Sequence, residues 1–203
     1  MTRQTSSRTG IVLLVSGPSG SGKTTLCRRL ADENEAVYST SCTTRPPREG
    51  ERHGHDYYFL SHDEFAQRIE AGDFLEHAEV HGNFYGTLKS EVLDHISAGT
   101  DVVMDIDVQG ADQVRACPDP TINTALIDLF VMPPTNEELR KRLAGRGTDS
   151  EEVIALRMKN ALEEIKACSK YTYRLLSGTH KEDYPRFKAL LLAERLRASR
   201  AHS

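Results

Sequence analysis

The stretch that decides the fold is Gly17-Pro18-Ser19-Gly20-Ser21-Gly22-Lys23-Thr24, close to the start of the chain. It fits the pattern G-x-x-x-x-G-K-[ST] of a phosphate-binding loop. Its glycines let the backbone curl, so that successive N–H groups point inward at an anion. Lys23 adds a mobile positive charge for the outer phosphates, and the Thr24 hydroxyl is suited to ligate Mg²⁺. The stretch therefore predicts a nucleoside triphosphate site.

The sequence on both sides of the loop supports this interpretation. Residues 11–15 form a continuous apolar run, which is typical of a buried parallel strand. Leu26 and Leu30 follow at a helical spacing, so the loop opens a helix whose positive N-terminal end faces the phosphates. The alternative, a Gly/Ser-rich turn that binds nothing, leaves this context unexplained. The loop alone does not say which reaction follows.

The size and charge of the chain bound its function. With 203 residues it is long enough for one compact domain with a sizeable core and small inserted lobes. Its net charge of −4 gives no sign of a general nucleic-acid or anionic-membrane binder. No apolar run approaches the roughly 18 residues that span a bilayer, and no signal peptide is evident. We expect a cytoplasmic protein that binds neither nucleic acid nor membrane; the sequence leaves open whether it is a monomer or a homo-oligomer.

The four cysteines, Cys27, Cys42, Cys117 and Cys168, are far apart and form no C-x-x-C pair. This spacing argues against a zinc site or a redox motif and favours scattered thiols in a cytosolic protein. Cys42 lies among hydroxyl side chains and near Arg45, which makes a lowered thiol pKa conceivable, but a small space-filling role is favoured.

Apolar runs that alternate with helical stripes predict an α/β fold. Runs at 102–107, 125–131 and 171–176 indicate further strands. The alternation implies a parallel sheet with helices on both faces, and ligands that bind beyond the carboxyl ends of its strands. Helices are predicted after Ser61-x-x-Glu64, at 88–96, after Thr135-x-x-Glu138, after Thr148-x-x-Glu151 with Ile154, Met158, Ala161 and Ile165 facing the core, and around Phe187, Leu190, Leu191 and Leu192.

From about 38 to 85 the composition of the sequence changes. The apolar runs shorten, and turn residues, aromatics and arginines become more frequent. Residues 57–60 and 74–80 are predicted as short strands on either side of the helix that Ser61 begins and Gly72 ends. This block therefore predicts a lobe inserted into the main sheet.

Asp105 and Asp107 follow a predicted buried strand, where an acid near the magnesium usually lies in such folds. Strand alternation puts both side chains on the same side of the strand. The alternative is that the two acids only cap the following turn and helix. Because the phosphate loop also follows a strand, we favour a role in the site for at least one of them.

A basic segment follows the first helix. Arg45 and Arg48 lie three residues apart and are stiffened by two prolines, so they offer paired guanidinium groups to a second phosphate. Tyr57 follows a few residues later. A solvated basic loop is the alternative, and the segment alone does not decide between the two.

A third cluster carries a candidate for base recognition. Gly82-Asn83 predicts a tight turn, which places Glu76 and Tyr85 across a hairpin. Guanine presents two adjacent donors, N1–H and N2–H₂, and Glu76 can accept from both. A hydroxyl from Ser41 or Thr87 can donate to the neighbouring O6 acceptor. Adenine would turn a bare N1 lone pair toward the carboxylate, and a buried unpaired charge is a strong basis for rejection.

Two further arginines are candidates for contacting the transferring phosphoryl group. Gly145 and Gly147 flank Arg146 and make it mobile, as a lid residue should be. Arg157 lies on the next predicted helix. We predict that both arginines, with Lys23, brace the phosphoryl group as charge spreads onto its outer oxygens. For Arg157 alone, a surface helix charge is the alternative.

Four linked segments together resemble the guanylate kinase family, over nearly the whole chain from the phosphate loop to about Tyr173. They are Ser-Cys-Thr-Thr-Arg-x-x-Arg-x-Gly-Glu from Ser41, Gly-Asn-x-Tyr-Gly-Thr from Gly82, Asp-Ile-Asp-x-Gln-Gly from Asp105, and Gly-Arg-Gly-Thr from Gly145. Their combination is far more specific than the loop alone. The resemblance implies a P-loop kinase fold, with a parallel sheet flanked by helices, an inserted GMP-binding lobe and a lid.

The resemblance also implies boundaries and residue roles. A single domain over 1–203 would comprise a core (about 10–37, 93–137 and 165–203), a GMP-binding lobe (about 38–92) and a lid (about 138–164). The expected GMP-binding positions are Ser41, Arg45, Arg48, Tyr57, Glu76, Tyr85, Thr87, Asp105 and Asp107. The expected ATP-binding positions are Gly17, Pro18, Ser19, Gly20, Ser21, Gly22, Lys23, Thr24 and Thr25, with Thr24 as the Mg²⁺ ligand.

The implied reaction is direct in-line phosphoryl transfer from ATP to GMP, with dGMP as a second acceptor and Mg²⁺ as the metal. One departure is visible: the family usually carries an Asn just after the final strand, near the adenine, where this chain has Ser177-Gly178. No adenine-contacting residue is therefore assigned.

Two other functions stay open at this point. The first is another small-molecule kinase on the same scaffold, acting on a ribose bisphosphate or a different nucleoside monophosphate. The second is a guanylate-kinase-like module that no longer catalyses and instead binds phosphopeptides. The intact Gly22, Lys23 and Thr24 argue against the second.

Overall fold

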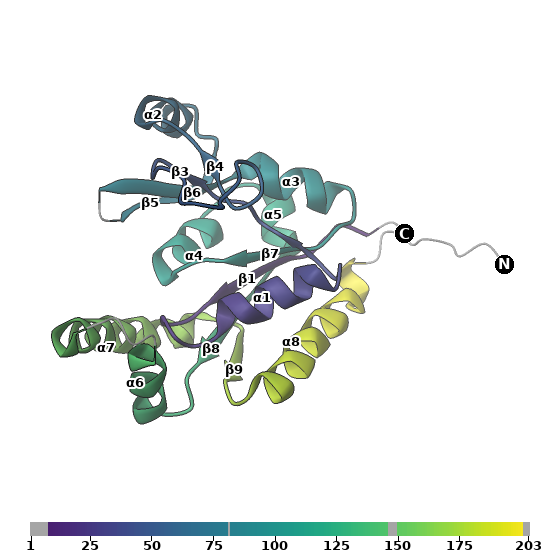
Figure 1. The fold of residues 1–203 in the computed structure, drawn as a ribbon. Coiled ribbons are helices and arrows are strands. Elements are labelled where there is room, and N and C mark those ends of the chain that lie inside the picture. Colours follow the sequence, from purple (N-terminus) through teal and green to yellow (C-terminus); the bar gives the residue numbers. More distant parts are fainter. Residues whose placement is uncertain (1–7, 81, 146–149, 201–203) are drawn as a thin grey trace.

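Across residues 8–80, 82–145 and 150–200, which the computed structural model describes, five parallel strands form a central sheet (Figure 1). The strand order is β2-β7-β1-β8-β9, and every neighbouring pair in it is parallel, which confirms the predicted α/β fold. The strands are β1 (Val12–Ser16), β2 (Val37–Tyr38), β7 (Val102–Asp105), β8 (Leu126–Met132) and β9 (Tyr173–Leu176).

The middle strand, β1, contributes to two hydrophobic cores on opposite faces of the sheet. Leu13 and Val15 pack with α1 and α8, whereas Val12 and Leu14 pack with α3, α4 and α5. Successive side chains of a strand point to opposite faces, so burial on both faces explains the unbroken apolar run. The helices are α1 (Lys23–Asp32), α3 (Lys89–Ser97), α4 (Val108–Arg115), α5 (Pro120–Ala125) and α8 (His180–Arg195).

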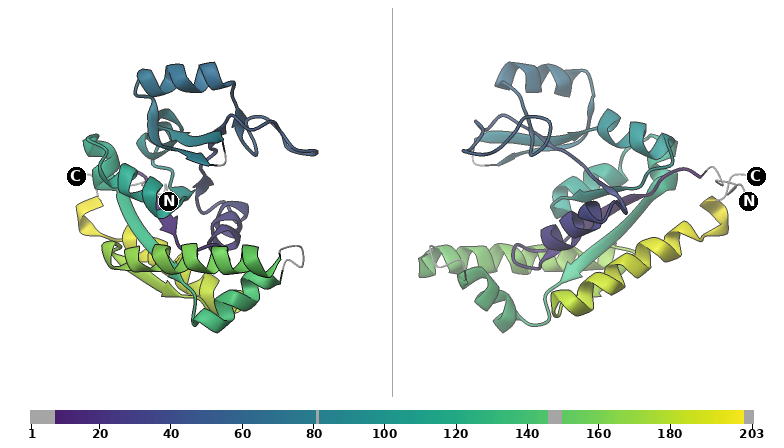
Figure 2. Two further views of the ribbon diagram at one scale, coloured as in Figure 1. Left: turned by 90° about the vertical axis from the view of Figure 1, so that its left-hand side faces the viewer. Right: turned by 45° about the vertical axis from the view of Figure 1, so that its right-hand side comes forward.

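A second, mixed sheet lies apart from the central one, at the top of Figure 1 and in both views of Figure 2. Its order is β4-β3-β6-β5, with β3 (Cys42–Thr43), β4 (Tyr58–Phe59), β5 (Phe74–Val80) and β6 (Asn83–Leu88). Helix α2 (His62–Glu70) covers this sheet, and its Phe65 stacks on Phe74 with ring centroids 4.3 Å apart. Ser61 begins α2 with the predicted capping box.

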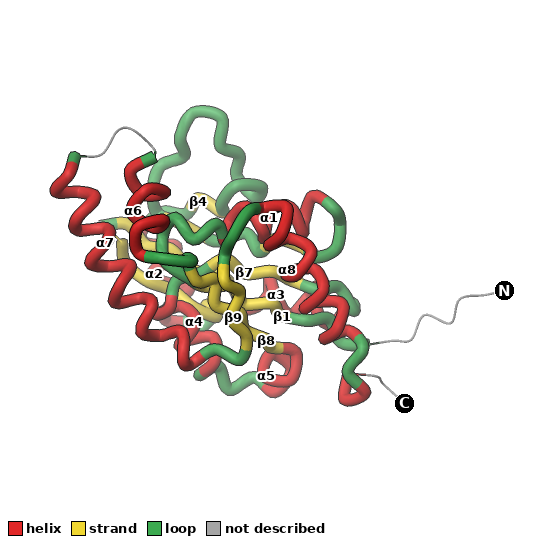
Figure 3. The backbone as a smooth tube through the Cα atoms, turned by 90° about the horizontal axis from the view of Figure 1, so that it is seen from below, coloured by secondary structure: helices red, strands yellow, loops and turns green. Residues whose placement is uncertain are grey.

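Helices α6 (Asn136–Ala144) and α7 (Glu151–Lys166) lie side by side and share a small apolar cluster of their own (Figure 3). The cluster contains Leu139, Leu143 and Ala161, with Met158 and Ile165 packed against it. Thr135 caps α6 as predicted. The predicted start of the next helix was wrong, because Ser150 is the N-cap of α7 and accepts from the backbone N–H of Val153. Thr148, which was predicted as the cap, lies outside the described residues.

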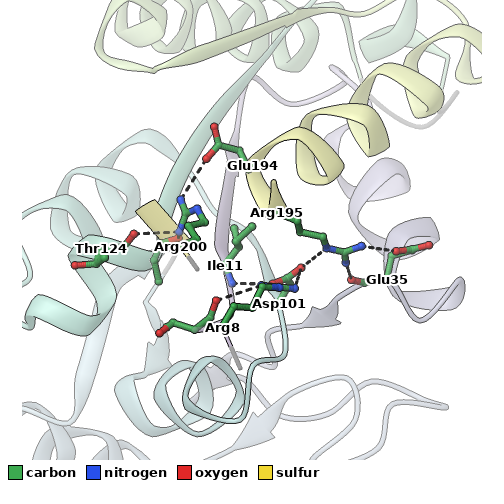
Figure 4. Close-up of polar contacts among 10 residues, drawn as sticks. Arg8, Ile11, Glu35, Asp101, Thr124, Glu194, Arg195 and Arg200 are labelled. Atoms are coloured by element: carbon green, nitrogen blue, oxygen red, sulfur yellow. Dashed lines mark hydrogen bonds and ion pairs between the residues drawn. The ribbon is translucent and has the colours of Figure 1, made fainter. Parts of the chain in front are cut away.

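Asp101, immediately before β7, joins distant parts of the chain (Figure 4). It lies at the opposite end of β7 from Asp105, which faces the phosphate loop. Its side chain is 0% exposed and pairs with Arg8 at 2.6 Å and with Arg195 of α8 at 2.7 Å. It also accepts a hydrogen bond from the backbone N–H of Ile11. Because Arg195 also pairs with Glu35, this network fastens α8 to the central sheet.

One local expectation needs correction and others are confirmed. Asp107 is not a strand residue: β7 ends at Asp105, and Asp107 caps α4. The predicted closing helix around Phe187 is confirmed as α8; Leu192 on it is 44% exposed, because α8 buries the side that carries Phe187 and Leu191. Cys42 is buried, and that burial raises the pKa of its thiol to about 11, so a space-filling role is confirmed. The two-residue strands β2 and β3 were not predicted, and neither was α5.

Candidate active site

The phosphate loop connects β1 to α1, as the sequence predicts. Its glycines are needed for two different reasons. A Cβ at Gly17 would lie 2.4 Å from the Val131 carbonyl oxygen, which no side chain tolerates. Gly22 has a φ of +94°, a conformation that favours glycine, and is the N-cap of α1. Because it has no side chain to occupy the first N–H groups of α1, these groups stay available to an anion.

Asp105 faces the loop from the end of the neighbouring strand. The Thr24 hydroxyl donates a hydrogen bond to Asp105 Oδ2, and the Lys23 ammonium lies 3.9 Å from Oδ1. The Tyr38 hydroxyl also donates to Oδ2, at 3.4 Å. Sequence reasoning predicted that Asp105 and the loop converge, but it missed Tyr38, which ends an unpredicted strand.

The oxygens of Thr24 and Asp105 fit a magnesium ion. Mg²⁺ prefers oxygen ligands and usually keeps several waters, with few protein ligands beside substrate phosphates. Within the described residues there is no group of three or more His, Cys, Asp or Glu side chains arranged to hold a metal. A sparse donor set of one hydroxyl and one carboxylate beside a phosphate loop therefore suits Mg²⁺ better than a metal that demands a full protein cage.

A cavity of about 600 Å³ opens over the phosphate loop. Lys23, Thr24 and Thr25 line one part of it, and the segment 177–180 after β9 lines another. Arg157 reaches the loop from α7, where its Nη2 donates to Ser19 Oγ at 2.9 Å. The structure thus brings Arg157 to the loop, whereas Arg146 lies outside the described residues.

Arg142 is a further cavity residue that sequence reasoning missed. Its guanidinium donates to Glu138 Oε1, to Ser177 Oγ and to the Gly178 carbonyl oxygen. These three bonds fix the plane of the side chain at the wall of the cavity. No local pattern distinguishes Arg142 from the other basic residues of α6, because two of its partners lie after β9.

Glu164 is also new to the site. It lines a second cavity, of about 340 Å³, together with the loop, Asp105 and Asp107. Burial raises the pKa of its carboxyl, Lys23 lowers it and Asp107 raises it. Helical periodicity was the signal that could have found it, since Glu164 follows Arg157 by two turns on the same helix.

Glu76 lies on β5, in the second sheet, and is 8% exposed. The Thr87 hydroxyl donates to its Oε1 at 2.7 Å, and Ser41 Oγ lies 3.4 Å from Thr87 Oγ1. Burial raises the pKa of the Glu76 carboxyl; the Thr87 bond opposes this, and the nearby Asp107 adds to it. The predicted turn places Thr87, not Tyr85, directly across the hairpin, because Tyr85 pairs with Ala78.

Asp107 lies close to Glu76 although Asp107 is the N-cap of α4 and Glu76 is on β5 of the second sheet. As the N-cap of α4, its Oδ1 accepts from the backbone N–H groups of Gln109 and Gly110 at 3.0 and 2.8 Å. A Cβ at Gly110 would lie 3.1 Å from Glu76 Oε2 and 3.5 Å from Asp107 Oδ1. Both the capping role and the location near the site that were considered for Asp107 therefore apply to the same side chain.

The basic segment brings Arg45 together with two tyrosines. The Arg45 guanidinium lies 5.5 Å from the Tyr57 ring centroid, and the Tyr57 and Tyr85 rings lie 6.2 Å apart. Glu51 accepts two hydrogen bonds from Arg45 Nη2, at 2.9 and 3.0 Å, and the pKa of its carboxyl is lowered mainly by that contact. Arg48 is exposed, and its backbone N–H donates to the same Glu51.

Comparisons with known proteins agree with this arrangement. The family model described as guanylate kinase matches residues 8–194. A guanylate kinase of Clostridium tetani is 42% identical over 191 residues, covering 94% of this chain and 89% of its own length. One of Ruegeria pomeroyi is 44% identical over 191 residues, covering 94% and 88%.

Solved structures show the same likeness. The crystal structure of guanylate kinase from Anaplasma phagocytophilum superposes with a TM-score of 0.74 at 32% identity, covering 96% of this chain and 91% of that one. A gluconokinase from Sinorhizobium meliloti, at 16% identity and a TM-score of 0.50, shares the fold alone. With a family model that spans most of the chain and relatives above 40% identity, the chain belongs to the guanylate kinase family.

Proposed function

We propose that the chain transfers the γ-phosphoryl group of ATP to GMP, giving ADP and GDP, and that it also accepts dGMP. The observation that carries this proposal is the buried Glu76 carboxylate, held by Thr87 and close to Asp107. Its two oxygens are fitting acceptors for the adjacent N1–H and N2–H₂ donors of guanine, whereas adenine would leave the charge unpaired.

The acceptor site draws on both sheets. Glu76, Ser41 and Thr87 select the base, while Arg45, Arg48, Tyr57 and Tyr85 hold the GMP phosphate. Asp105 and Asp107 lie between the two nucleotides. The contacts among Arg45, Tyr57 and Tyr85 support a shared phosphate site, because a guanidinium and two phenolic hydroxyls together supply several donors to one anion. The Glu51 carboxylate accepts two hydrogen bonds from Arg45 Nη2, a donor that the phosphate would also use.

The donor site is the cavity above residues 17–25. The loop's N–H groups and Lys23 bind the phosphates, and Arg157 stabilises the charge that spreads over the outer oxygens during transfer. Arg146 is proposed for the same task on the strength of the sequence alone. Thr24 would hold Mg²⁺, which when bound neutralises the phosphate oxygens. The GMP phosphate oxygen attacks phosphorus directly, so the chain supplies alignment and no covalent intermediate.

A division into three parts follows from these roles. We propose a core of about 10–37, 93–137 and 165–203, a GMP-binding lobe of about 38–92 and a lid of about 138–164. The separate sheet around β5 and the separate cluster shared by α6 and α7 support this division. A lid that closes would exclude water, which would otherwise take the phosphoryl group.

We also propose a cytoplasmic role in purine nucleotide metabolism. Cys27, Cys42, Cys117 and Cys168 are all free thiols, as suits a reducing compartment. In the part of the chain that the structure describes, no helix has the length and apolar character to cross a bilayer.

A substrate panel tests the proposed reaction. ADP release from ATP and Mg²⁺ is measured with GMP, dGMP, AMP, UMP, dTMP and CMP as acceptors. We expect turnover with GMP and dGMP, and a kcat/KM for GMP that exceeds that for AMP by at least about 10³-fold. A preference for another monophosphate, or turnover with none of them, would contradict the proposal.

A further inference from the structure

Strand β5 is an edge strand of the second sheet, and the side chain of Gln113 pairs with its backbone at one residue. In the order β4-β3-β6-β5, β5 is the last strand, so half of its backbone groups face away from β6. At His77 both of these groups are taken by Gln113 of α4. The His77 N–H donates to Gln113 Oε1 at 3.0 Å, and Gln113 Nε2 donates to the His77 carbonyl oxygen at 2.9 Å.

This contact works like one more residue of an added strand. A glutamine amide carries an acceptor oxygen and a donor NH₂ group side by side, so it can pair with the N–H and C=O of one residue at the same time. The reciprocal pair also fixes which end of the amide is oxygen, since the opposite orientation would set two donors and two acceptors against each other. Gln113 is partly buried, and two hydrogen bonds hold its amide group.

The contact lies next to the residue that is proposed to select the base. His77 is the neighbour of Glu76 along β5, and Gln113 follows Gly110 by three residues and Asp107 by six. Residues three apart lie on one side of a helix, so α4 presents Gly110 and Gln113 to β5 together, and Asp107 lies at the N-cap of the same helix. The room left by the absent Gly110 side chain lets the Glu76 carboxylate approach within van der Waals distance of α4.

We propose that Gln113 is a positioning residue for guanine recognition: by pairing with the backbone of His77, it sets the distance between the Glu76 carboxylate on β5 and Asp107 at the start of α4. The proposal rests on the proposed function of Glu76. Gln113 itself touches no substrate in this scheme. Without the pair, β5 keeps its hydrogen bonds to β6 but is no longer held at a fixed distance from α4. Glu76 then no longer accepts from both guanine donors at once.

The test uses the full chain with Gln113→Met, which keeps the length of the side chain and removes both hydrogen bonds. Gln113→Ala is made alongside it, in case the thioether finds another packing. The matched control is Gln67→Met on α2, at an exposed position far from α4. Kinetic constants are measured for GMP, for IMP, which lacks the 2-amino group, and for ATP, and thermal unfolding verifies that each variant folds.

We expect the KM for GMP to rise about tenfold in Gln113→Met, with kcat within about threefold of the wild type and the KM for ATP unchanged. The preference for GMP over IMP should fall by about fivefold or more, because a displaced carboxylate no longer accepts a hydrogen bond from the 2-amino group that IMP lacks. The Gln67→Met control should match the wild type in all these values.

Two results would overturn the proposal. One is a KM for GMP and a preference for GMP over IMP that both stay at the wild-type values in both Gln113 variants. The other is an equal rise in the KM values of ATP and GMP, which indicates general loosening. Both leave the proposed function intact so long as the wild-type chain phosphorylates GMP. If the wild type fails with GMP, the proposed function falls, and this proposal falls with it.

Discussion

The Thr24 hydroxyl donates a hydrogen bond to the Asp105 carboxylate across 81 positions of sequence. The contact exists because β1 and β7 are parallel neighbours, which brings the residues after their carboxyl ends together. It links the first helical turn after the phosphate loop to the acid that faces it. The phosphate loop and Asp105 are thus brought together by the topology of the sheet.

Lys23→Ala should lower kcat by about 100-fold or more, because it removes a positive charge from the spreading negative charge of the transition state. GMP affinity should stay within about threefold, since Glu76 lies on β5 of the second sheet and Arg45 follows β3 of that sheet. Steady-state kinetics and calorimetry with GMP measure the two effects. Lys159→Ala, at an exposed position of α7, is the matched control. Unchanged turnover in Lys23→Ala would count against the assignment.

Glu76→Gln should lower the efficiency with GMP far more than it changes the binding of ATP. The amide keeps one acceptor but turns an N–H₂ group toward a guanine donor, so kcat/KM for GMP should fall about 10²- to 10⁴-fold. The KM for ATP should stay within about twofold. Glu79→Gln, exposed on the same strand, provides the control. Equal losses for ATP and GMP would show that Glu76 maintains the fold and does not read the base.

The same variant should be more stable than the wild type at neutral pH. Burial raises the pKa of Glu76 above its value in the unfolded chain. The stability that comes from its protonated form is complete below the unfolded pKa and is lost as the pH rises through the folded pKa. Glu76→Gln resembles that protonated form at every pH.

The Tm of ligand-free Glu76→Gln should therefore exceed that of the wild type at pH 7.5, and the difference should shrink at pH 5. A change of 1 kcal/mol corresponds to roughly 2–4 °C in a chain of this size, which scanning calorimetry resolves. A difference that grows toward acidic pH would have the wrong sign for a buried carboxylate.

Asp101→Asn should lower the Tm without altering the chemistry. The variant leaves Arg8 and Arg195 facing a neutral amide, and breaking a buried pair costs up to about 3–5 kcal/mol. Because both arginines are about one-fifth exposed, at 23% and 22%, we expect about 2 kcal/mol and a loss of roughly 4–8 °C.

Turnover at 25 °C should persist in Asp101→Asn, because β7 separates this position from Asp105 by roughly 13 Å. Asp94→Asn, exposed on α3, is the matched control. A Tm equal to the wild type would mean that the Asp101 network adds no net stability.

Features set by neighbouring residues were predictable from the sequence. The phosphate loop, the capping box at Ser61 and the bounds of β5 each depend on side chains within a few positions of one another. Asp105 was predictable because parallel strands place their carboxyl ends together. These features needed no knowledge of distant contacts.

Features set by long-range pairing were not predictable. Strands β2 and β3 have two residues each and exist through their partners β7 and β6. Tyr38 enters the site on the first of them. The start of α7 was misjudged because Thr148 and Ser150 both carry hydroxyls that can cap a helix, and the structure has Ser150 as the N-cap. The Gln113 contact joins α4 to β5, 36 positions apart in the sequence, and has no local signature.

The most direct test of the account is a crystal structure with GMP and a non-hydrolysable ATP analogue bound together. We expect guanine N1 and N2 at about 2.7–3.2 Å from the Glu76 carboxylate oxygens, with the triphosphate against residues 17–24. Density for GMP anywhere other than beside Glu76, or an empty Glu76 pocket at saturating GMP, would contradict it.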